Sequence, residues 1–305
     1  MNNHTYAILQ KAFIEISTLL QEKDQIQLGK DLDDTNASND VQKPIDIQSN
    51  EIMINAAKEM PDVIGYISEE EREIIIFDNL PYEYISQGLI LVFDPLDGSK
   101  NVLSNLTAGT IYGFYEYDLF SKKIVGIFES GYALYGPATI MVSTDRNNVT
   151  LYQLNKKEKK FKFVDVLSPL KTKKEKIISI NAMNPVSETI RDVLTIYSNN
   201  GYTHRWAGAM VADCHQIIMR GGVFLYPENE KAENGKIRLL YEAAPLAYIF
   251  HLLGGMAIDT KNKLILEKVR DLSIIDDDVD IHRAIPVIMT SQEEYLKLTS
   301  LLFNK

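Results

Sequence analysis

LILVFDPLDGSKN, residues 89–101, is the stretch of sequence that decides the fold. Its first five residues are apolar and predict a buried strand. Two aspartates, Asp94 and Asp97, follow this run, and Pro95 stands between them. Because proline has no backbone N–H and a fixed φ, we expect Pro95 to stop the chain from continuing as sheet. The pattern therefore predicts two carboxylates that project from a turn at a strand end.

Two small residues follow the aspartates. Gly98 allows the backbone a close approach to a ligand or a neighbouring segment. Ser99 is expected to cap a helix whose free N–H groups point outward. Carboxylates beside an open helix N-terminus suit a phosphate that is bridged by Mg²⁺, a cation that prefers oxygen ligands. A generic Asp-x-x-Asp is more often an acidic turn without a ligand, but the whole string is far more specific.

Further acidic residues lie upstream of this string. The triplet Glu-Glu-Glu at 69–71 follows the apolar run 63–67, so it stands at a strand end, where α/β active sites collect residues. An isolated acidic run is more often a solvated loop. Asp46 and Glu51, taken alone, are ordinary polar residues before a helix.

Composition limits the classes of function. The chain has 305 residues, a net charge of −10 and 45% hydrophobic residues, which is ordinary for a globular enzyme with a large core or two domains. The acidic balance argues against nucleic-acid and membrane-surface binding, and no apolar run approaches the roughly 18 residues that span a bilayer. The single cysteine, Cys214, predicts no internal disulfide, a cytoplasmic location and a packing role for its side chain.

Apolar periodicity and turn residues place the remaining elements. We expect helices near 6–22, 51–60, 186–199, 208–220, 242–253 and 291–303, with a loop over 30–40. Strands are expected at 62–67, 89–93, 177–180 and 223–226, with several more between 108 and 166. The result is a layered α and β protein with a strand-rich half, 1–170, and a helix–strand half, 171–305.

Nine collinear strings resemble those of class I fructose-1,6-bisphosphatases, from about residue 40 to the C-terminus. They are PIDIQSNE (44–51), ISEEE (67–71), VFDPLDGSKN (92–101), GTIYGFY (109–115), GYALYGPAT (131–139), AGAMVADCH (207–215), GGVFLYP (221–227), NGKIRLLYE (234–242) and GGMAID (254–259). The resemblance implies the sugar phosphatase fold, a layered αβαβα sandwich of the α+β class with mixed sheets. It also implies an N-terminal metal- and phosphate-binding domain, 1–170, and a C-terminal sugar-phosphate-binding domain, 171–305.

The resemblance assigns roles to individual residues. The implied metal ligands are the side chains of Glu69, Asp94, Asp97 and Glu242 and the backbone carbonyl of Leu96, with Asp46 near a further metal. Gly98 and Ser99 are implied to hold the reacting 1-phosphate, and Asn181, Tyr226 and Lys236 to surround the sugar and its 6-phosphate. Arg205 matches an arginine that reaches into the neighbouring subunit's site, so a homotetramer is expected. Without the resemblance, Lys236 and Arg238 would be surface charges and Glu242 a helix-capping residue.

The implied chemistry is hydrolysis of the 1-phosphate of fructose 1,6-bisphosphate in gluconeogenesis. Two or three Mg²⁺ ions per subunit, with Mn²⁺ as an alternative, would neutralise the phosphate charge and lower the pKa of a bound water. Glu70, together with Glu51, is expected to take the proton from that water. The metals would also turn an acidic pocket into a receptor for an anion.

Several positions depart from the family pattern. Lys100 replaces a serine beside the phosphate, and Glu51 replaces an aspartate with a side chain one methylene longer. Asn184 replaces a family tyrosine near the 6-phosphate, and Trp206 replaces another tyrosine, beside Arg205. The N-terminus lacks the string that binds AMP in the regulated animal enzymes, so we expect no conventional AMP inhibition.

Other functions stay open at this point. A sedoheptulose-1,7-bisphosphatase or a dual-specificity enzyme is compatible with the changed positions, whereas an inositol monophosphatase lacks the later strings. A non-catalytic homologue that binds sugar phosphate is the alternative of a different class, supported by the Lys100 and Glu51 changes. The Asp213 and His215 pair does not predict a metal site, because residues two apart on a helix do not share a face.

Overall fold

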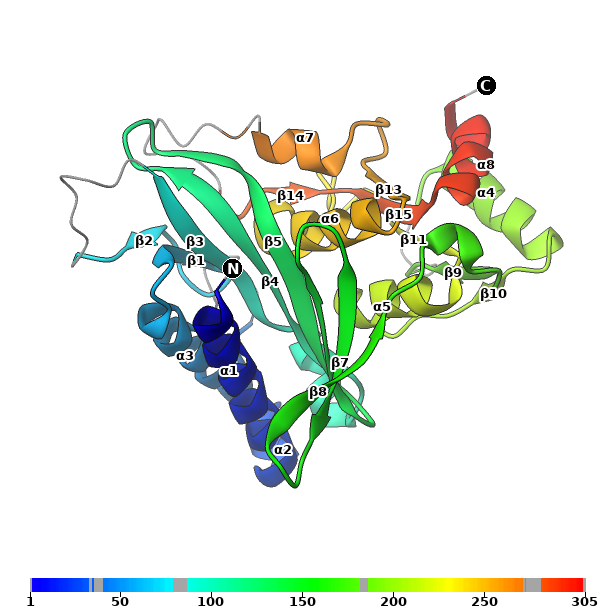
Figure 1. The fold of residues 1–305 in the computed structure, drawn as a ribbon. Coiled ribbons are helices and arrows are strands. Elements are labelled where there is room, and N and C mark those ends of the chain that lie inside the picture. Colours follow the sequence, from blue (N-terminus) through cyan, green and yellow to red (C-terminus); the bar gives the residue numbers. More distant parts are fainter. Residues whose placement is uncertain are drawn as a thin grey trace.

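The computed structural model describes residues 2–32, 35, 41–78, 87–181, 186–270, 272 and 281–303 (Figure 1). The helices are α1 (Asn3–Glu22), α2 (Gln25–Leu28), α3 (Pro44–Glu59), α4 (Glu188–Asn199), α5 (Met210–Arg220), α6 (Ala244–Leu252), α7 (Ile265–Arg270) and α8 (Gln292–Phe303). Two short 3₁₀ helices, η1 (Ser99–Ser104) and η2 (Leu170–Thr172), and one π turn, η3 (Leu239–Ala243), complete the helical elements of this part of the chain.

The strands form two main sheets and a short ribbon. They are β1 (Val63–Ser68), β2 (Ile75–Ile76), β3 (Gln87–Asp97), β4 (Ala108–Asp118), β5 (Lys123–Tyr135), β6 (Thr139–Thr144), β7 (Val149–Asn155), β8 (Lys160–Val166), β9 (Ile177–Ser179), β10 (Thr203–His204), β11 (Val223–Tyr226), β12 (Ile237–Arg238), β13 (Gly255–Ile258), β14 (Ala284–Ile285) and β15 (Val287–Ser291). The first sheet has eight strands in the order β2-β1-β3-β4-β5-β6-β7-β8, and the second has five in the order β10-β9-β11-β15-β13. Both sheets mix parallel and antiparallel pairs, as expected from the sequence.

The elements stack as helix, sheet, helix, sheet, helix, and three apolar clusters lie between these layers. Alternate residues of one strand enter different clusters: Leu91 and Phe93 of β3 pack toward α1 and α3, whereas Ile90 and Val92 pack toward α5 and α6. In the second sheet, Phe224 of β11 faces the middle helices, and its two neighbours in β11 face α4 and α8. The predicted αβαβα sandwich with mixed sheets is therefore confirmed.

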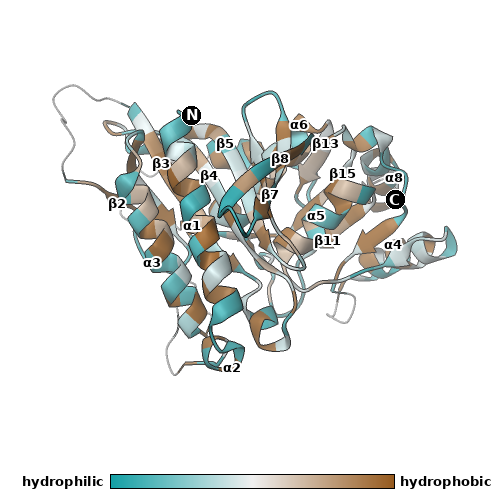
Figure 2. Cartoon of the chain, turned by 60° about the horizontal axis from the view of Figure 1, so that its bottom comes forward, coloured by the Kyte–Doolittle hydropathy of each residue, from teal (hydrophilic) through white to brown (hydrophobic). Residues whose placement is uncertain are grey.

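Helix α1 shows how local sequence sets an outer layer. The side chain of Asn2 accepts hydrogen bonds at 2.9 Å from the backbone N–H groups of His4 and Thr5, which caps the helix. Apolar residues at helical spacing, including Phe13 and Ile16, are fully buried against the first sheet. Figure 2 shows α1 and α3 side by side, each with hydrophobic and hydrophilic residues along its length. No described helix combines the length and the apolar character needed to cross a membrane.

Some predicted boundaries were wrong. The strand expected at 89–93 continues through Pro95 to Asp97, because the proline lies at a bulge where the ladder to β4 is interrupted and needs no N–H. The helix expected at 51–60 begins earlier, at Pro44, whose ring suits the first helical turn. The final turn before α6 is a π turn, so the helix expected from 242 is not regular at its start.

The loop expected over 30–40 lies mostly outside the described residues. The predicted division near residue 170 stays a prediction. One feature that bears on it is the middle apolar cluster, which includes Ile90 and Tyr115 from the first half and Phe224, Tyr241 and Phe250 from the second. Residues from both halves thus bury one another, and we expect the chain to unfold in a single transition.

A buried hydrogen bond across this middle layer gives a test. The hydroxyl of Tyr115 donates to the backbone carbonyl of Leu240 at 2.6 Å, and Tyr115 is fully buried. Tyr115→Phe leaves that carbonyl without its donor, so the free energy of unfolding in urea should fall by about 1–3 kcal/mol in one transition. Tyr152→Phe, at a partly buried ring on β7, is the control and should change it by less than about 0.5 kcal/mol. Equal effects in the two variants would contradict the assignment.

Candidate active site

Three carboxylates from distant parts of the sequence meet at one point. Asp94 and Asp97 lie at the end of β3, and Glu242 lies in the π turn η3. One oxygen atom of each side chain lies within 4.8 Å of the others. Asp94 is only 2% exposed and Asp97 is 9% exposed. Such a spacing matches oxygen ligands around a shared cation, since Mg²⁺ binds oxygens at about 2.0–2.1 Å.

A β-bulge brings the two aspartates to the same side of β3. Residues three apart on a regular strand point to opposite faces. Here Asp94 pairs with Ile111 and Asp97 pairs with Gly109. The two aspartates are three residues apart on β3, whereas their partners are only two residues apart on β4. The extra residue returns the second aspartate to the face of the first. The backbone N–H of Leu96 donates to Asp94 at 2.8 Å, which stabilises this bent segment.

Glycine is required at position 98 for two reasons. The φ angle of Gly98 is 78°, in the left-handed region that favours glycine. A Cβ atom at this position would also lie 2.4 Å from the Cβ of Ala209, the residue that precedes α5. This close approach lets the first backbone N–H groups of α5 reach Asp97, and the N–H of Val211 donates to its carboxylate at 2.6 Å.

Ser99 does not act as the predicted helix cap. It is the first residue of η1, Gly98 occupies the cap position, and no side-chain capping hydrogen bond is formed. Its side chain instead lies near the carboxylate of Asp46 and lowers the pKa of that group. Asp46 also accepts a hydrogen bond from the backbone N–H of Lys43 at 2.9 Å, so it stabilises the start of α3 while lying beside the site.

The acidic triplet lies next to the aspartates because β1 runs parallel to β3. The backbone N–H of Glu69 donates to the carbonyl of Phe93 at 3.2 Å, and the side chain of Glu69 lies close enough to Asp94 to raise the pKa of that group. Glu70 accepts a hydrogen bond from the side chain of Gln42 at 2.5 Å. The structure therefore brings together four of the sequence-predicted metal ligands: Glu69, Asp94, Asp97 and Glu242.

Burial and mutual repulsion disfavour the charged forms of these groups. Burial raises the pKa of Asp94 well above its usual range, and the nearby charges of Glu69, Asp97 and Glu242 raise it further. Burial raises the pKa of Asp97 to about 7 against the lowering effect of the hydrogen bonds from Val211 and Met210. Burial, followed by the charge of Glu70, raises the pKa of Asp46 to about 7. A bound divalent cation would remove this penalty, so the donor set fits a hard metal ion.

A pocket of about 850 Å³ holds the residues predicted to surround the sugar. Asn181, Tyr226 and Lys236 all line it. The ring of Trp206 lies 6.0 Å from that of Tyr226, measured between centroids, so this departure from the family pattern lies beside the pocket. Arg205 is exposed on the segment after β10, and it does not line this pocket.

Some predicted positions are not joined to the cluster. Glu51 is exposed on α3, and its side chain forms no hydrogen bond or ion pair with the described residues. The neighbouring Asn50 reaches the acidic turn instead, and its side chain donates to Glu71 at 3.2 Å. Lys100 is exposed. Asn184 lies outside the described residues.

Sequence reasoning missed several residues that hold the site together. Gln42 and Asn50 bond the acidic triplet from the segment around α3. Asp213 is fully buried and accepts hydrogen bonds from the side chain of Ser179 and the backbone N–H of Ala207, so it holds the segment before α5. The signal that could have identified Asp213 is the presence of a charged residue within the otherwise mostly apolar stretch 209–218. His215 contacts the hydroxyl of Tyr132 through its Nδ1 atom at 2.8 Å.

Comparison with known proteins identifies the family. The family model described as the fructose-1-6-bisphosphatase N-terminal domain matches residues 6–166, and the model of the C-terminal domain matches residues 171–293. The chain belongs to the fructose-1,6-bisphosphatase family. This family belongs to the phosphoric monoester hydrolases, and the resemblance stated from the sequence is confirmed.

Individual relatives of the family extend over most of the chain. Fructose-1,6-bisphosphatase 1 of Bos taurus is 34% identical over 278 residues, which are 85% of this chain and 77% of the relative. The class 1 enzyme of Sulfurihydrogenibium is 32% identical over 276 residues, 87% of this chain and 80% of the relative. The crystal structure of Leishmania major fructose-1,6-bisphosphatase in holo form matches 99% of this chain and 95% of its own, with a TM-score of 0.86 and 26% identity.

The raised pKa values predict that the metal-free protein becomes less stable as the pH rises. Asp46 and Asp97 move from 3.8 to about 7 on folding, so between these values the native state binds more protons than the unfolded chain. The free energy of unfolding in EDTA should therefore fall as the pH rises from 5 to 8, by on the order of 5 kcal/mol for the two groups together. Above pH 7 this stabilisation is lost.

Addition of Mg²⁺ at pH 8 should restore stability, by about 2.7 kcal/mol at one hundred times the dissociation constant. Urea unfolding at several pH values measures both effects. Asp97→Asn should flatten the pH profile and weaken the response to Mg²⁺. A metal-free protein whose stability rises from pH 5 to 8 would contradict the account.

Proposed function

We propose that this protein hydrolyses the 1-phosphate of fructose 1,6-bisphosphate to give fructose 6-phosphate and phosphate, with two or three Mg²⁺ ions per subunit. The observation that carries the proposal is the cluster of Asp94, Asp97 and Glu242 within 4.8 Å, in a chain of this family. Mn²⁺ would substitute for Mg²⁺, because both accept oxygen ligands. A cytoplasmic role in gluconeogenesis fits this reaction and the single buried cysteine.

The metal ions would supply Lewis acidity and a bound water of lowered pKa. Glu69, Asp94, Asp97 and Glu242 would hold them, with the carbonyl of Leu96 as a further ligand and Asp46 near a third ion. This assignment rests on the shared position of the four carboxylates and on the fit of hard oxygen donors to Mg²⁺.

The chain's own residues would then position the phosphate and move one proton. Gly98 and Ser99 hold the 1-phosphate next to the aspartates. Glu70, whose carboxylate is held by Gln42, accepts the proton of the attacking water. Glu51, which is exposed on α3, remains its proposed partner in this transfer. The water oxygen bonds to phosphorus as the bond to the sugar oxygen breaks, and the sugar oxygen leaves with the bonding electrons and takes up a proton from solvent to become the 1-hydroxyl.

The opposite end of the substrate would occupy the pocket that Asn181, Tyr226 and Lys236 line. A lysine there offers a positive charge to the 6-phosphate in a protein of net charge −10. Arg205 does not line this pocket within its own subunit, which supports its assignment to a neighbouring subunit's site in a homotetramer. Trp206, which replaces a family tyrosine, lies beside Tyr226 of this pocket. A seven-carbon sugar bisphosphate is therefore the alternative substrate.

Phosphate release from fructose 1,6-bisphosphate in the presence of Mg²⁺ tests the reaction. We expect EDTA to abolish it and Asp97→Asn to lower kcat/KM by more than about a hundredfold, because a ligand of the shared cation is lost. Asp165→Asn, an exposed position on β8, is the matched control and should retain full activity. Activity that survives EDTA would contradict the proposal, and a higher kcat/KM on sedoheptulose 1,7-bisphosphate would move the assignment to the alternative sugar.

A complementation experiment tests the shared pocket. Lys236→Ala and Arg205→Ala should each raise KM at least tenfold with a smaller change in kcat, because both cations act on binding. If Arg205 serves a neighbour, dissociating and remixing the two variants creates some sites with both native side chains and recovers part of the low-KM activity. No recovery in mixed oligomers, verified by mass, would place Arg205 and Lys236 in the same subunit's site.

A further inference from the structure

His282 lies between two segments that carry acidic residues of the site. Its Nε2 atom lies 3.0 Å from the backbone carbonyl of Glu71, and its Nδ1 atom lies 2.8 Å from the hydroxyl of Tyr241. Its own backbone carbonyl accepts a hydrogen bond from the guanidinium of Arg238 at 3.0 Å. Glu71 and Tyr241 are 170 residues apart in sequence, so His282 is a bridge between distant parts of the chain.

The first end of the bridge fixes the acidic triplet. Glu71 follows Glu69 and Glu70 directly, so holding its carbonyl holds the turn that carries their side chains. On the other side, the carboxylate of Glu71 accepts a hydrogen bond from Asn50 at 3.2 Å. The side chain of Asn50 in turn accepts one from Ser68 at 2.6 Å. The turn is thus held between α3 and His282.

The second end of the bridge fixes the π turn. Tyr241 is fully buried and immediately precedes Glu242. Arg238, whose guanidinium bonds His282, also donates its backbone N–H to the carboxylate of Glu242. Two separate contacts therefore connect His282 to the segment that aims Glu242 at the two aspartates.

The two hydrogen-bond partners of His282 determine which of its ring nitrogens carries a hydrogen. A backbone carbonyl can only accept, so Nε2 of His282 carries a hydrogen and donates to Glu71. In the neutral ring Nδ1 is then an acceptor, and the Tyr241 hydroxyl donates to it. Both ring nitrogens are occupied by the protein, and neither is free to coordinate a metal or move a proton. The chemistry of His282 is therefore that of a connector.

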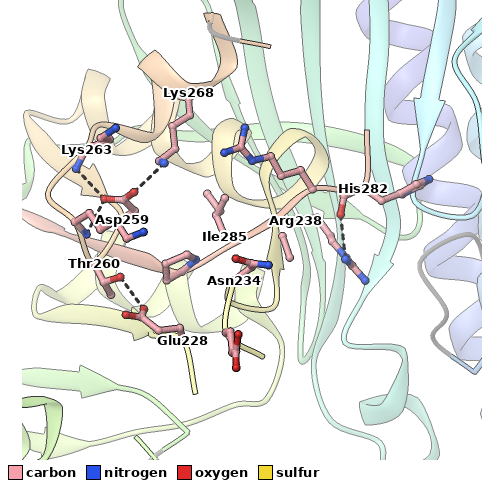
Figure 3. Close-up of a pocket in the computed structure, with 14 residues that line it drawn as sticks. Glu228, Asn234, Arg238, Asp259, Thr260, Lys263, Lys268, His282 and Ile285 are labelled. Atoms are coloured by element: carbon pink, nitrogen blue, oxygen red, sulfur yellow. Dashed lines mark hydrogen bonds and ion pairs between the residues drawn. The ribbon is translucent and has the colours of Figure 1, made fainter. Parts of the chain in front are cut away.

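A pocket of about 810 Å³ lies beside this bridge, on the side of β14 (Figure 3). Arg238 and His282 stand at one end of it, and Asp259 with Lys268 stands at the other, joined by an ion pair of 2.8 Å. It is distinct from the three-carboxylate cluster, none of whose members line it.

We propose that His282 is a positioning residue, which fixes the separation between the turn of Glu69 and Glu70 and the π turn of Glu242. The inference rests on the proposed metal-dependent phosphatase function. Metal ligands and a general base must stay within a fraction of an ångström of their productive positions, and a displacement of about 1 Å can cost a hundredfold in rate. Loss of the bridge loosens both segments, although the chain still carries every proposed ligand residue.

The test uses His282→Leu, which loses both ring contacts, and His282→Gln, whose amide retains a donor at the distance of Nε2. We expect His282→Leu to lower kcat by about 10- to 100-fold, with KM for the sugar bisphosphate changed less than threefold. The Mg²⁺ concentration for half-maximal rate should rise severalfold. His282→Gln should recover part of the loss, because the bond to Glu71 returns.

The chain offers a matched control in a second tyrosine–histidine pair. Tyr132 and His215 share the same 2.8 Å contact between hydroxyl and Nδ1, with ring centroids 5.8 Å apart against 5.7 Å for Tyr241 and His282. His215→Leu should lower the free energy of unfolding, with kcat and the Mg²⁺ response of the folded fraction unchanged. If His282→Leu behaves like His215→Leu, the positioning role is wrong.

Titration of Mn²⁺ by calorimetry separates this inference from the proposed function. If the wild-type protein binds Mn²⁺ and His282→Leu binds it several times more weakly, the bridge holds the ligands whatever the substrate. Equal affinity in the two proteins would overturn the inference even if the wild type is an active phosphatase. An inactive wild type would overturn the proposed function alone.

Discussion

Repulsion among buried carboxylates is the constraint on which this structure depends. Asp94 is almost completely removed from water, and its pKa is raised by burial and then by Glu69, Asp97 and Glu242. An arrangement of this kind costs stability unless protons or cations occupy it, because several like charges share a poorly solvated volume. The fold must therefore hold these side chains together against their own charges.

Each local irregularity near the site serves to hold a carboxylate. The bulge in β3 places two aspartates on one face, and the left-handed Gly98 brings the start of α5 to Asp97. The π turn carries Glu242, and irregular helical turns of this kind often occur at functional sites. The regular layers around them supply the rigidity, since the apolar cluster between the sheets contains residues from both halves of the chain.

Much of the fold could be predicted from local patterns. The apolar runs predicted the strands near β1 and β3, and apolar residues at helical spacing predicted α1, α4 and α5. Both patterns depend only on residues that are close in sequence. The string of residues 92–101 identified the site for a similar reason, since its two aspartates and the glycine needed for the turn are all local. The placement of Glu69 followed from its position after a strand.

The remainder depends on contacts between distant residues. Nothing near Pro95 reveals that β4 would continue to pair beyond it, so the bulge was predicted as a strand end. Ser99 is a residue type that often caps helices, yet Gly98 occupies the cap position of η1 and the side chain of Ser99 lies near Asp46 of α3. The bridging role of His282 depends on Glu71 and Tyr241, and no pattern in the chain links these three positions.

The central claim is that Asp94, Asp97 and Glu242 share a divalent cation. Crystals grown with Mn²⁺ and measured near the manganese absorption edge would locate it directly by anomalous scattering. The account predicts a strong anomalous peak within about 2.0–2.4 Å of oxygens from these three side chains. Its loss in Asp97→Asn crystals would complete the test. A peak elsewhere, with the three carboxylates bonded only to protein or water, would contradict the claim.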